Sequence, residues 1–180
     1  MRRLSGFALL TAALAGSAVA GAQPLSVPEV PDAIRAPAGS QLLLKAHASG
    51  AQIYRCMQEA DGTLHWILKG PEAELRDDKG TVIGRHYAGP AWRHNDGSVV
   101  VGKAIAHVES PQPDSIPWLL LSAVGHEGHG ALERVTGIQR IDTRGGLPPP
   151  AVQCDAARRD LEARSAYSAD YYFYAAGDKK

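Results

Sequence analysis

Short apolar segments separated by turn residues recur along most of the chain, and this pattern predicts β-strands rather than helices. In residues 63–68 the side chains alternate between two faces, as expected of a half-buried strand. Residues 99–108 form the longest such segment, and residues 118–124 are apolar on both faces, which favours a buried central strand. Many short strands of this kind predict an antiparallel all-β domain, either a sandwich or a barrel.

Turn signals such as Asp61-Gly62, Gly89-Pro90 and Asn95-Asp96-Gly97 divide the expected strands. Further breaks are expected at Ser49-Gly50 and Gly70-Pro71, because glycine and proline interrupt strand patterns. The strands expected on this basis cover residues 41–48, 51–59, 63–68, 73–76, 82–87, 92–94, 99–108, 118–124, 135–143 and 167–174.

One segment near the C-terminus reads as a helix. Asp155 is a suitable N-cap, and the alanines and arginines that follow it favour a short helix over residues 155–164. The prolines of residues 23–39 favour an extended lead-in. We therefore expect one antiparallel β domain over residues 40–176, followed by a polar tail at 177–180.

The N-terminus has the features of a secretory signal peptide over residues 1–22. Arg2 and Arg3 precede an apolar run at 7–15 that is too short to span a membrane. Small residues follow, and cleavage after Ala20 or after Ala22 fits equally well. The sequence therefore predicts export to the periplasm or the extracellular medium.

Composition excludes several classes of partner. The 180-residue chain has a formal net charge of zero and no basic cluster, so neither nucleic acid nor an anionic membrane is a favoured partner. No other apolar segment approaches the ~20 residues that a membrane-spanning helix needs. The sequence lacks both a glycine-rich phosphate loop and a Gly-x-Ser-x-Gly elbow, and no cofactor is expected. The oligomeric state is left open.

The two cysteines, Cys56 and Cys154, have two possible roles. In an exported chain an even number of cysteines favours one disulfide bond. The alternative is a metal ligand or a catalytic thiol, which the absence of a Cys-x-x-Cys pair disfavours. A disulfide here would close a loop of about a hundred residues and stabilise the fold by up to roughly 4–5 kcal/mol on the chain-entropy model.

Several short motifs are specific in combination. They include Gly50-Ala51-Gln52-Ile53-Tyr54-Arg55-Cys56, Gly84-x-His86-Tyr87-Ala88-Gly89-Pro90-x-Trp92, Asp96-Gly97-Ser98, Ile116-Pro117-Trp118-Leu119-Leu120-Leu121, Val135-Thr136-x-Ile138-Gln139-Arg140, Cys154 and Tyr167-x-Ala169-Asp170-Tyr171-Tyr172-Phe173-Tyr174. Over about residues 50–174 the chain resembles the exported proteins of domain-of-unknown-function family 3455. The resemblance implies a single secreted domain of this length and brings no established activity, cofactor or catalytic residue.

Polar and aromatic side chains gather in residues 83–98, which makes this stretch the first candidate for a site. With two residues of a later strand, they would form a polar pocket with an aromatic wall, a common arrangement in small-molecule and sugar sites. The candidate ligand-binding residues are His86, Tyr87, Trp92, Asp96, Arg140 and Asp142.

Four of these candidates also have a purely structural interpretation. His86 would then hydrogen-bond a nearby carbonyl, and Trp92 would belong to the core. Asp96 precedes a glycine and suits a turn. Arg140 lies in an apolar strand, where an inward side chain would need a carboxylate or a bound anion, and an outward one would face water.

Two further groups of residues are weaker candidates. Together with His94 or His107, His126 and His129 could collect Cu²⁺ or Zn²⁺. Their spacing is not that of a His-Glu-x-x-His helix, however, and a solvated turn is the simpler interpretation. In the aromatic run at 171–174, alternation places one pair of rings in the core and the other outward. An exposed pair would suit carbohydrate stacking.

Three functions remain open on the sequence alone. The first is a non-catalytic module that binds a small molecule, a carbohydrate or an envelope partner through the region of His86 to Ser98. The second is a secreted enzyme, a hydrolase or a metal-dependent one, that uses His86 with Asp96 or Asp142. The third is a structural envelope protein without a concave site. Catalysis would require a base and its partners to converge within about 3 Å of one position.

Overall fold

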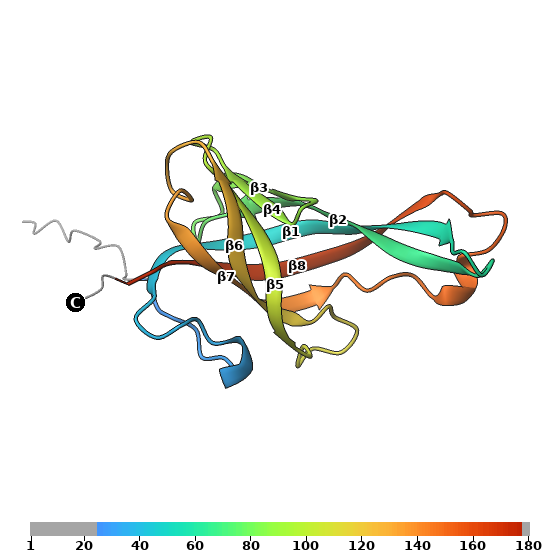
Figure 1. Cartoon of the computed structure of the whole chain (residues 1–180), viewed down its shortest axis with the longest axis horizontal. Coiled ribbons are helices and arrows are strands. Elements are labelled where there is room, and N and C mark those ends of the chain that lie inside the picture. The colour runs from blue at the N-terminus through green and yellow to red at the C-terminus, as the bar shows by residue number, and fades with distance from the viewer. Residues whose placement is uncertain (1–24, 178–180) are drawn as a thin grey trace, which may run out of the picture.

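Eight antiparallel strands form one sheet in residues 25–177, the part of the chain that this computed structural model describes (Figure 1). Each strand pairs with the next, and β8 pairs with β1, so the sheet closes into a barrel. The all-β prediction is confirmed. The strands are β1 (Gln41–Gln58), β2 (Leu64–Arg76), β3 (Val82–Tyr87), β4 (Ala91–His94), β5 (Val99–Val108), β6 (Trp118–Glu127), β7 (Val135–Gly145) and β8 (Glu162–Ala175).

Helix is almost absent from the same residues. The helical elements there are the short 3₁₀ turns η1 (Asp32–Ile34) and η2 (Ala151–Gln153). Among residues 25–177 there is no helix with the length and apolar character needed to cross a membrane. The predicted signal peptide at 1–22 lies outside the described residues, as does most of the predicted tail.

The prediction of a helix over 155–164 is wrong. Asp155 does act as a cap, since its carboxylate accepts hydrogen bonds from the backbone N–H groups of Ala157 and Arg158 at 3.1 and 3.0 Å. The chain nevertheless leaves the turn at once, because the N–H of Asp160 donates to the carbonyl of Cys56 at 2.8 Å and β8 begins two residues later. A helix this short is marginal by itself, so pairing with β1 decides the conformation.

Two strands are longer than the sequence pattern predicted. β1 continues through Gly50, and β2 continues through Gly70-Pro71. Gly50 permits a close approach of the two strands: a Cβ atom there would lie 2.1 Å from the carbonyl oxygen of Glu72. Glycine at this position therefore allows close strand packing and does not mark a turn.

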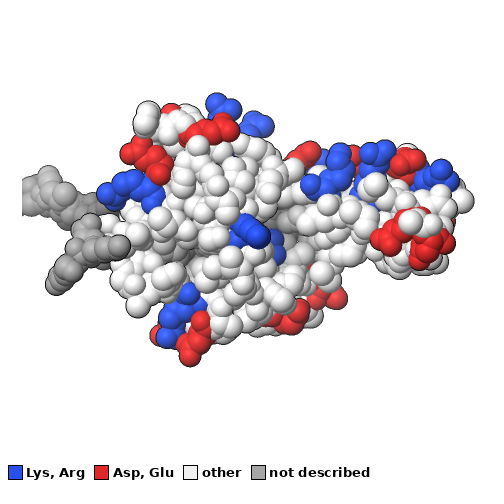
Figure 2. Space-filling model, viewed as in Figure 1, with Lys and Arg blue, Asp and Glu red and all other residues white. Residues whose placement is uncertain are grey.

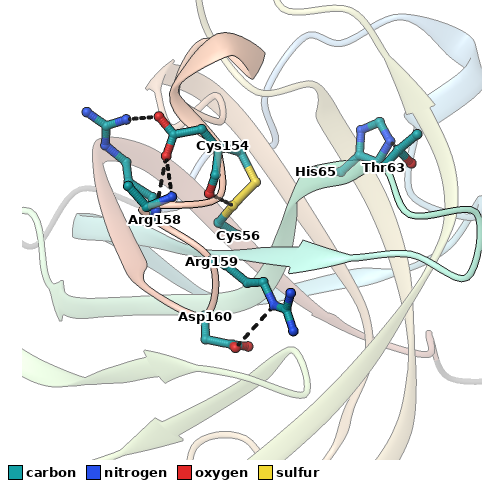
Figure 3. The surroundings of a disulfide bond; sticks show 9 residues. Cys56, Thr63, His65, Cys154, Arg158, Arg159 and Asp160 are labelled. Atoms are coloured by element: carbon teal, nitrogen blue, oxygen red, sulfur yellow. Dashed lines mark hydrogen bonds and ion pairs between the residues drawn. A yellow bond between two sulfur atoms is a disulfide. The ribbon is translucent and has the colours of Figure 1, made fainter.

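An arm extends from the barrel where β1, β2 and β8 continue beyond their neighbours (Figure 1). It consists of residues 53–58, 64–70 and 162–166, together with the connection 147–161. The disulfide bond between Cys56 and Cys154, with a Cα–Cα distance of 5.3 Å, ties this connection to β1 (Figure 3). The disulfide prediction is confirmed, and no described cysteine is free.

Alternation along β8 places aromatic rings on both faces of the sheet. Tyr171 and Phe173 belong to the core inside the barrel, whereas Tyr172 and Tyr174 pack in a second cluster on its outer face. The outer pair is not exposed, because Ile34 of the N-terminal lead-in belongs to the same cluster. The expected open surface for carbohydrate stacking is therefore absent at these tyrosines.

Hydrogen bonds hold the lead-in against the barrel. The side-chain N–H of Gln139 donates to the carbonyl of Ile34 at 2.7 Å, and the hydroxyl of Tyr174 donates to Oε1 of Gln139 at 2.6 Å. Ile34 itself is completely buried. The lead-in thus contributes to the core as well as preceding the first strand.

Candidate functional site

A cavity of about 330 Å³ lies in the barrel and receives side chains from all eight strands. Its volume is near the lower end of small-molecule sites and about twice the roughly 150 Å³ that hold one benzene. Most of the wall is apolar. The polar and charged side chains that line it are Gln52, Lys69, His86, Arg140 and Tyr171.

His86 and Trp92 stack on each other inside the barrel. They are directly opposite residues of β3 and β4, so their side chains project from the same face of the sheet. Their ring centroids lie 4.4 Å apart, with an angle of 6° between the planes. Gly102 on β5 leaves room for the indole, since a Cβ atom there would come within 2.9 Å of it. Tyr171 meets both rings edge-on, at 5.0 and 5.3 Å.

The imidazole of His86 is neutral and has a defined tautomer. Its Nδ1 lies 2.8 Å from the carbonyl oxygen of Ala91, so Nδ1 carries the proton and donates, and Nε2 has a free lone pair. Burial, opposed by the bond to Ala91 and assisted by the positive charge of Arg140, lowers the pKa of His86 to about 3. His86 thus offers a hydrogen-bond acceptor and no charge.

Arg140 reaches the cavity from β7. Its partners across the neighbouring strands are Leu119 and Tyr171, which also line the cavity. Nε and one terminal nitrogen donate to the carbonyl of Pro117, at 3.2 and 2.8 Å. Within the described part of the chain, no carboxylate lies within 4.0 Å of the guanidinium. The charge is therefore half-buried without a counter-ion.

Three other lining residues carry buried polar atoms that have no hydrogen-bond partner. They are Oε1 of Gln52, Nε1 of Trp92 and the hydroxyl of Tyr171, which lies beside the side chains of Tyr167 and Arg140 without a hydrogen bond of regular geometry to either. Burial raises the pKa of Tyr171, so its hydroxyl stays protonated and can donate. Buried polar groups are satisfied in the great majority of cases. Three of the seven such atoms in residues 25–177 belong to residues that line this cavity.

The six predicted site residues do not all come together. His86, Trp92 and Arg140 line the cavity, whereas Tyr87, Asp96 and Asp142 do not. Tyr87 is 39% exposed at the end of β3. Asp142 is exposed on β7 with a positive φ of 50°.

Asp96 connects two loops. Its carboxylate accepts hydrogen bonds from the N–H and hydroxyl of Ser98, at 2.9 and 2.6 Å, and from the N–H of Ala131 at 2.7 Å. His94 lies 2.9 Å away. Two hydrogen bonds hold the pKa of Asp96 well below its usual range. The larger effect comes from the hydroxyl of Ser98 and the next from the backbone N–H of Ala131. These contacts are those of a structural turn residue.

The two weak metal candidates are also engaged separately. Nε2 of His126 lies 2.7 Å from the carbonyl of Val135, and the exposed His129 contacts the carboxylate of Glu133 at 3.2 Å. Across residues 25–177, no set of three or more histidine, cysteine, aspartate or glutamate side chains is arranged to hold a metal ion.

A separate titratable cluster lies away from the cavity. His47 on β1 bridges two carboxylates: Nδ1 lies 2.6 Å from Asp170 and Nε2 lies 2.8 Å from Asp78. Burial acts to lower the pKa of His47, but the hydrogen bonds to Asp170 and then Asp78 outweigh it and raise the pKa. Lys45 joins both carboxylates, at 2.9 Å from Asp78 and 3.8 Å from Asp170.

Sequence reasoning missed Gln52 and Lys69, and it considered Tyr171 only as part of an aromatic run. Gln52 had a usable signal in the sequence, because it is a polar residue inside an otherwise apolar segment. In the structure its side chain is buried, with only 2% of the residue exposed. Lys69 had none, since an exposed lysine in a strand is ordinary.

The comparisons with known proteins identify a family but no activity. The sequence profile of the family described as "Protein of unknown function (DUF3455)" matches residues 37–175, which is more than half of the chain. No curated protein and no solved structure matches the chain. The match covers every strand of the barrel and all the residues that line the cavity. The chain therefore belongs to the DUF3455 family of proteins of unknown function.

Proposed function

We propose that this protein binds a small organic molecule in the barrel cavity. The observation that supports this most directly is a cavity of about 330 Å³ with mostly apolar walls and a few buried polar atoms that lack partners. Small-molecule sites commonly combine these features, and barrel mouths are a frequent location for them. Because the predicted signal peptide would direct the chain out of the cytoplasm, binding would take place in the periplasm or the medium.

A small ligand with an apolar body fits this lining better than a carbohydrate does. Trp92, Leu119 and Leu121 contribute apolar wall, whereas a sugar would need a hydrogen-bonding partner for most of its hydroxyl groups. An envelope partner would need a surface, whereas Gln52, Trp92 and Tyr171, which carry three of the buried polar atoms, line the cavity.

The enzymatic alternative has less support. It requires His86 to work with Asp96 or Asp142, and neither carboxylate lines the cavity. The lining contains no aspartate or glutamate at all, so His86 has no acidic partner to orient it as a general base there. Binding requires no such partner.

A cavity-filling variant tests the proposal. Ala104 and Ile105 are neighbours on β5 and both are exposed, but only Ala104 lines the cavity. We expect ring compounds such as indole, 2-naphthol and phenylacetate to raise the melting temperature of the wild-type protein. A ligand at a hundred times its Kd adds about 2.7 kcal/mol to the free energy of unfolding.

The matched variants decide the location of binding. Ala104→Trp should abolish the shift by filling the cavity, and Ile105→Trp should leave it unchanged. If no compound stabilises the wild-type protein, or if Ala104→Trp responds as the wild type does, the cavity is not a binding site.

A further inference from the structure

Charge in the cavity lining is entirely positive. Of the described residues 25–177, Arg140 and Lys69 are the only charged ones that line it. The ammonium group of Lys69 is paired with the carboxylate of Glu162, which lies outside the lining. Figure 2 shows that on one face of the molecule charged side chains gather on the arm and around the edges, with a small group of basic atoms in a hollow near the middle.

The guanidinium of Arg140 has donors to spare. A guanidinium has five N–H donors, and only two nitrogens of Arg140 donate to a protein acceptor, both to the carbonyl of Pro117. A carbonyl oxygen carries only a partial charge, so these bonds position the group without neutralising it. A half-buried cation without a counter-ion is costly, and structures generally supply one.

Neighbouring groups respond to this charge without balancing it. The positive charge of Arg140 acts to lower the pKa of Tyr171 and Tyr167, although burial outweighs it and raises both. Both phenols therefore stay neutral. His86 is neutral too, and its free Nε2 accepts rather than donates. None of these side chains supplies the missing negative charge.

We propose that the ligand is an organic anion, namely a monocarboxylate with one or two planar rings, whose carboxylate binds the guanidinium of Arg140. This assignment rests on the proposed function. Arg140 lines the cavity and its guanidinium has donors that Pro117 does not use, so a planar carboxylate can bind it there. The rings would lie against the apolar wall that Trp92 and Leu119 help to form. A single cation in an apolar cavity suits a singly charged group better than a phosphate.

Matched probes separate charge from shape. 1-Naphthoate and 1-naphthamide share one ring system and differ in charge, and their Kd values can be measured by titration calorimetry on the oxidised protein. We expect the carboxylate to bind at least ten-fold more tightly than the amide, which corresponds to about 1.4 kcal/mol. Arg140→Gln should remove this preference. Arg93→Gln is the control, because Arg93 is exposed on β4 outside the cavity and should leave the preference intact.

The outcomes distinguish the two proposals. Equal affinity for both probes in the wild type would overturn the anion assignment and leave the proposed function standing. Failure of both probes to bind would overturn the anion assignment, whereas the proposed function fails only if the compounds of the melting-temperature screen do not stabilise the wild-type protein either. A carboxylate preference that persists in Arg140→Gln would show that Arg140 is not the anion-binding residue.

A second variant keeps the test possible if Arg140→Gln does not fold. If Arg140→Gln does not fold, Arg140→Lys keeps the charge but loses the planar fork, and it should retain part of the preference. The comparison of the two probes on the wild-type protein decides by itself whether the ligand is an anion, and the variants decide whether Arg140 binds it.

Discussion

Replacement of His86 by glutamine should remove a defined part of the acid sensitivity of this protein. Burial lowers the pKa of His86 to about 3 in the folded state, with a smaller contribution from Arg140, whereas an unfolded chain has a histidine pKa near 6.5. Below pH 6.5 the imidazole of His86 therefore binds a proton in the unfolded state but stays neutral in the folded state. The stability contributed by this neutral histidine is fully present above pH 6.5 and falls as the pH drops toward 3.

The size of the effect follows from the two pKa values. At pH 4.5 the unfolded imidazole is two pH units below its pKa, and the folded one is still almost entirely neutral. Each unit is worth 1.36 kcal/mol, so the loss between pH 7 and pH 4.5 is about 2–3 kcal/mol. This is a large part of the 5–15 kcal/mol that is typical of the stability of a domain.

Urea unfolding followed by tryptophan fluorescence at pH 7.0 and pH 4.5 measures this quantity. The difference in free energy of unfolding between the two pH values should be about 2–3 kcal/mol smaller in His86→Gln than in the wild type, whatever the variant costs at pH 7. His107→Gln, at an exposed position of β5, should behave as the wild type does. Parallel pH dependences for the wild type and His86→Gln would refute the argument, since they would mean that the folded protein protonates His86 as readily as the unfolded chain does.

Three further predictions concern the rest of the fold. Replacing Cys56 and Cys154 by alanine opens a disulfide with a sequence separation of 98, so the free energy of unfolding should fall by about 4–5 kcal/mol on the chain-entropy model; a change below about 1 kcal/mol in urea titrations would contradict it. Ile34→Ala should cost about 2–5 kcal/mol in the same assay because Ile34 is completely buried, and Leu25→Ala, at a 45% exposed position, should cost less than about 0.5 kcal/mol. The raised pKa of His47 gives a contribution to stability that is fully present below about pH 6.5 and is lost as the pH rises through the folded pKa. His47→Gln should therefore flatten the melting temperature between pH 6 and pH 9, and an unchanged slope would exclude this role.

Local patterns determined the class of the fold. Strand positions were predictable because successive side chains point to opposite faces of a sheet, so one buried face imposes a period of two on the sequence. Turns such as Asn95-Asp96-Gly97 were predictable because few residues adopt the backbone angles that tight turns need. The pairing of Cys56 with Cys154 followed from an even count of two in a chain predicted to be exported.

Other features depended on contacts between distant segments. The predicted helix over 155–164 failed because hydrogen bonds to Cys56 on β1 outweighed weak helical preferences. Gly50 resembled a turn residue, and only its closeness to β2 showed why the strand continues there. Asp96 was predicted both as a turn residue and as a site residue, and its bonds to Ser98 and Ala131 are those of the turn.

The candidate site was also predictable in part from local sequence and in part decided by contacts between distant segments. The sequence by itself identified His86, Trp92 and Arg140 as unusual, and it left open whether Arg140 points inward or toward water. Closure of the sheet by β1 and β8 decided this, because it brought β7 and β8 to the same interior as the stacked pair on β3 and β4. Periodicity assigns a residue to one of two faces, but it is the long-range pairing of strands that makes one of those faces the inside of a barrel.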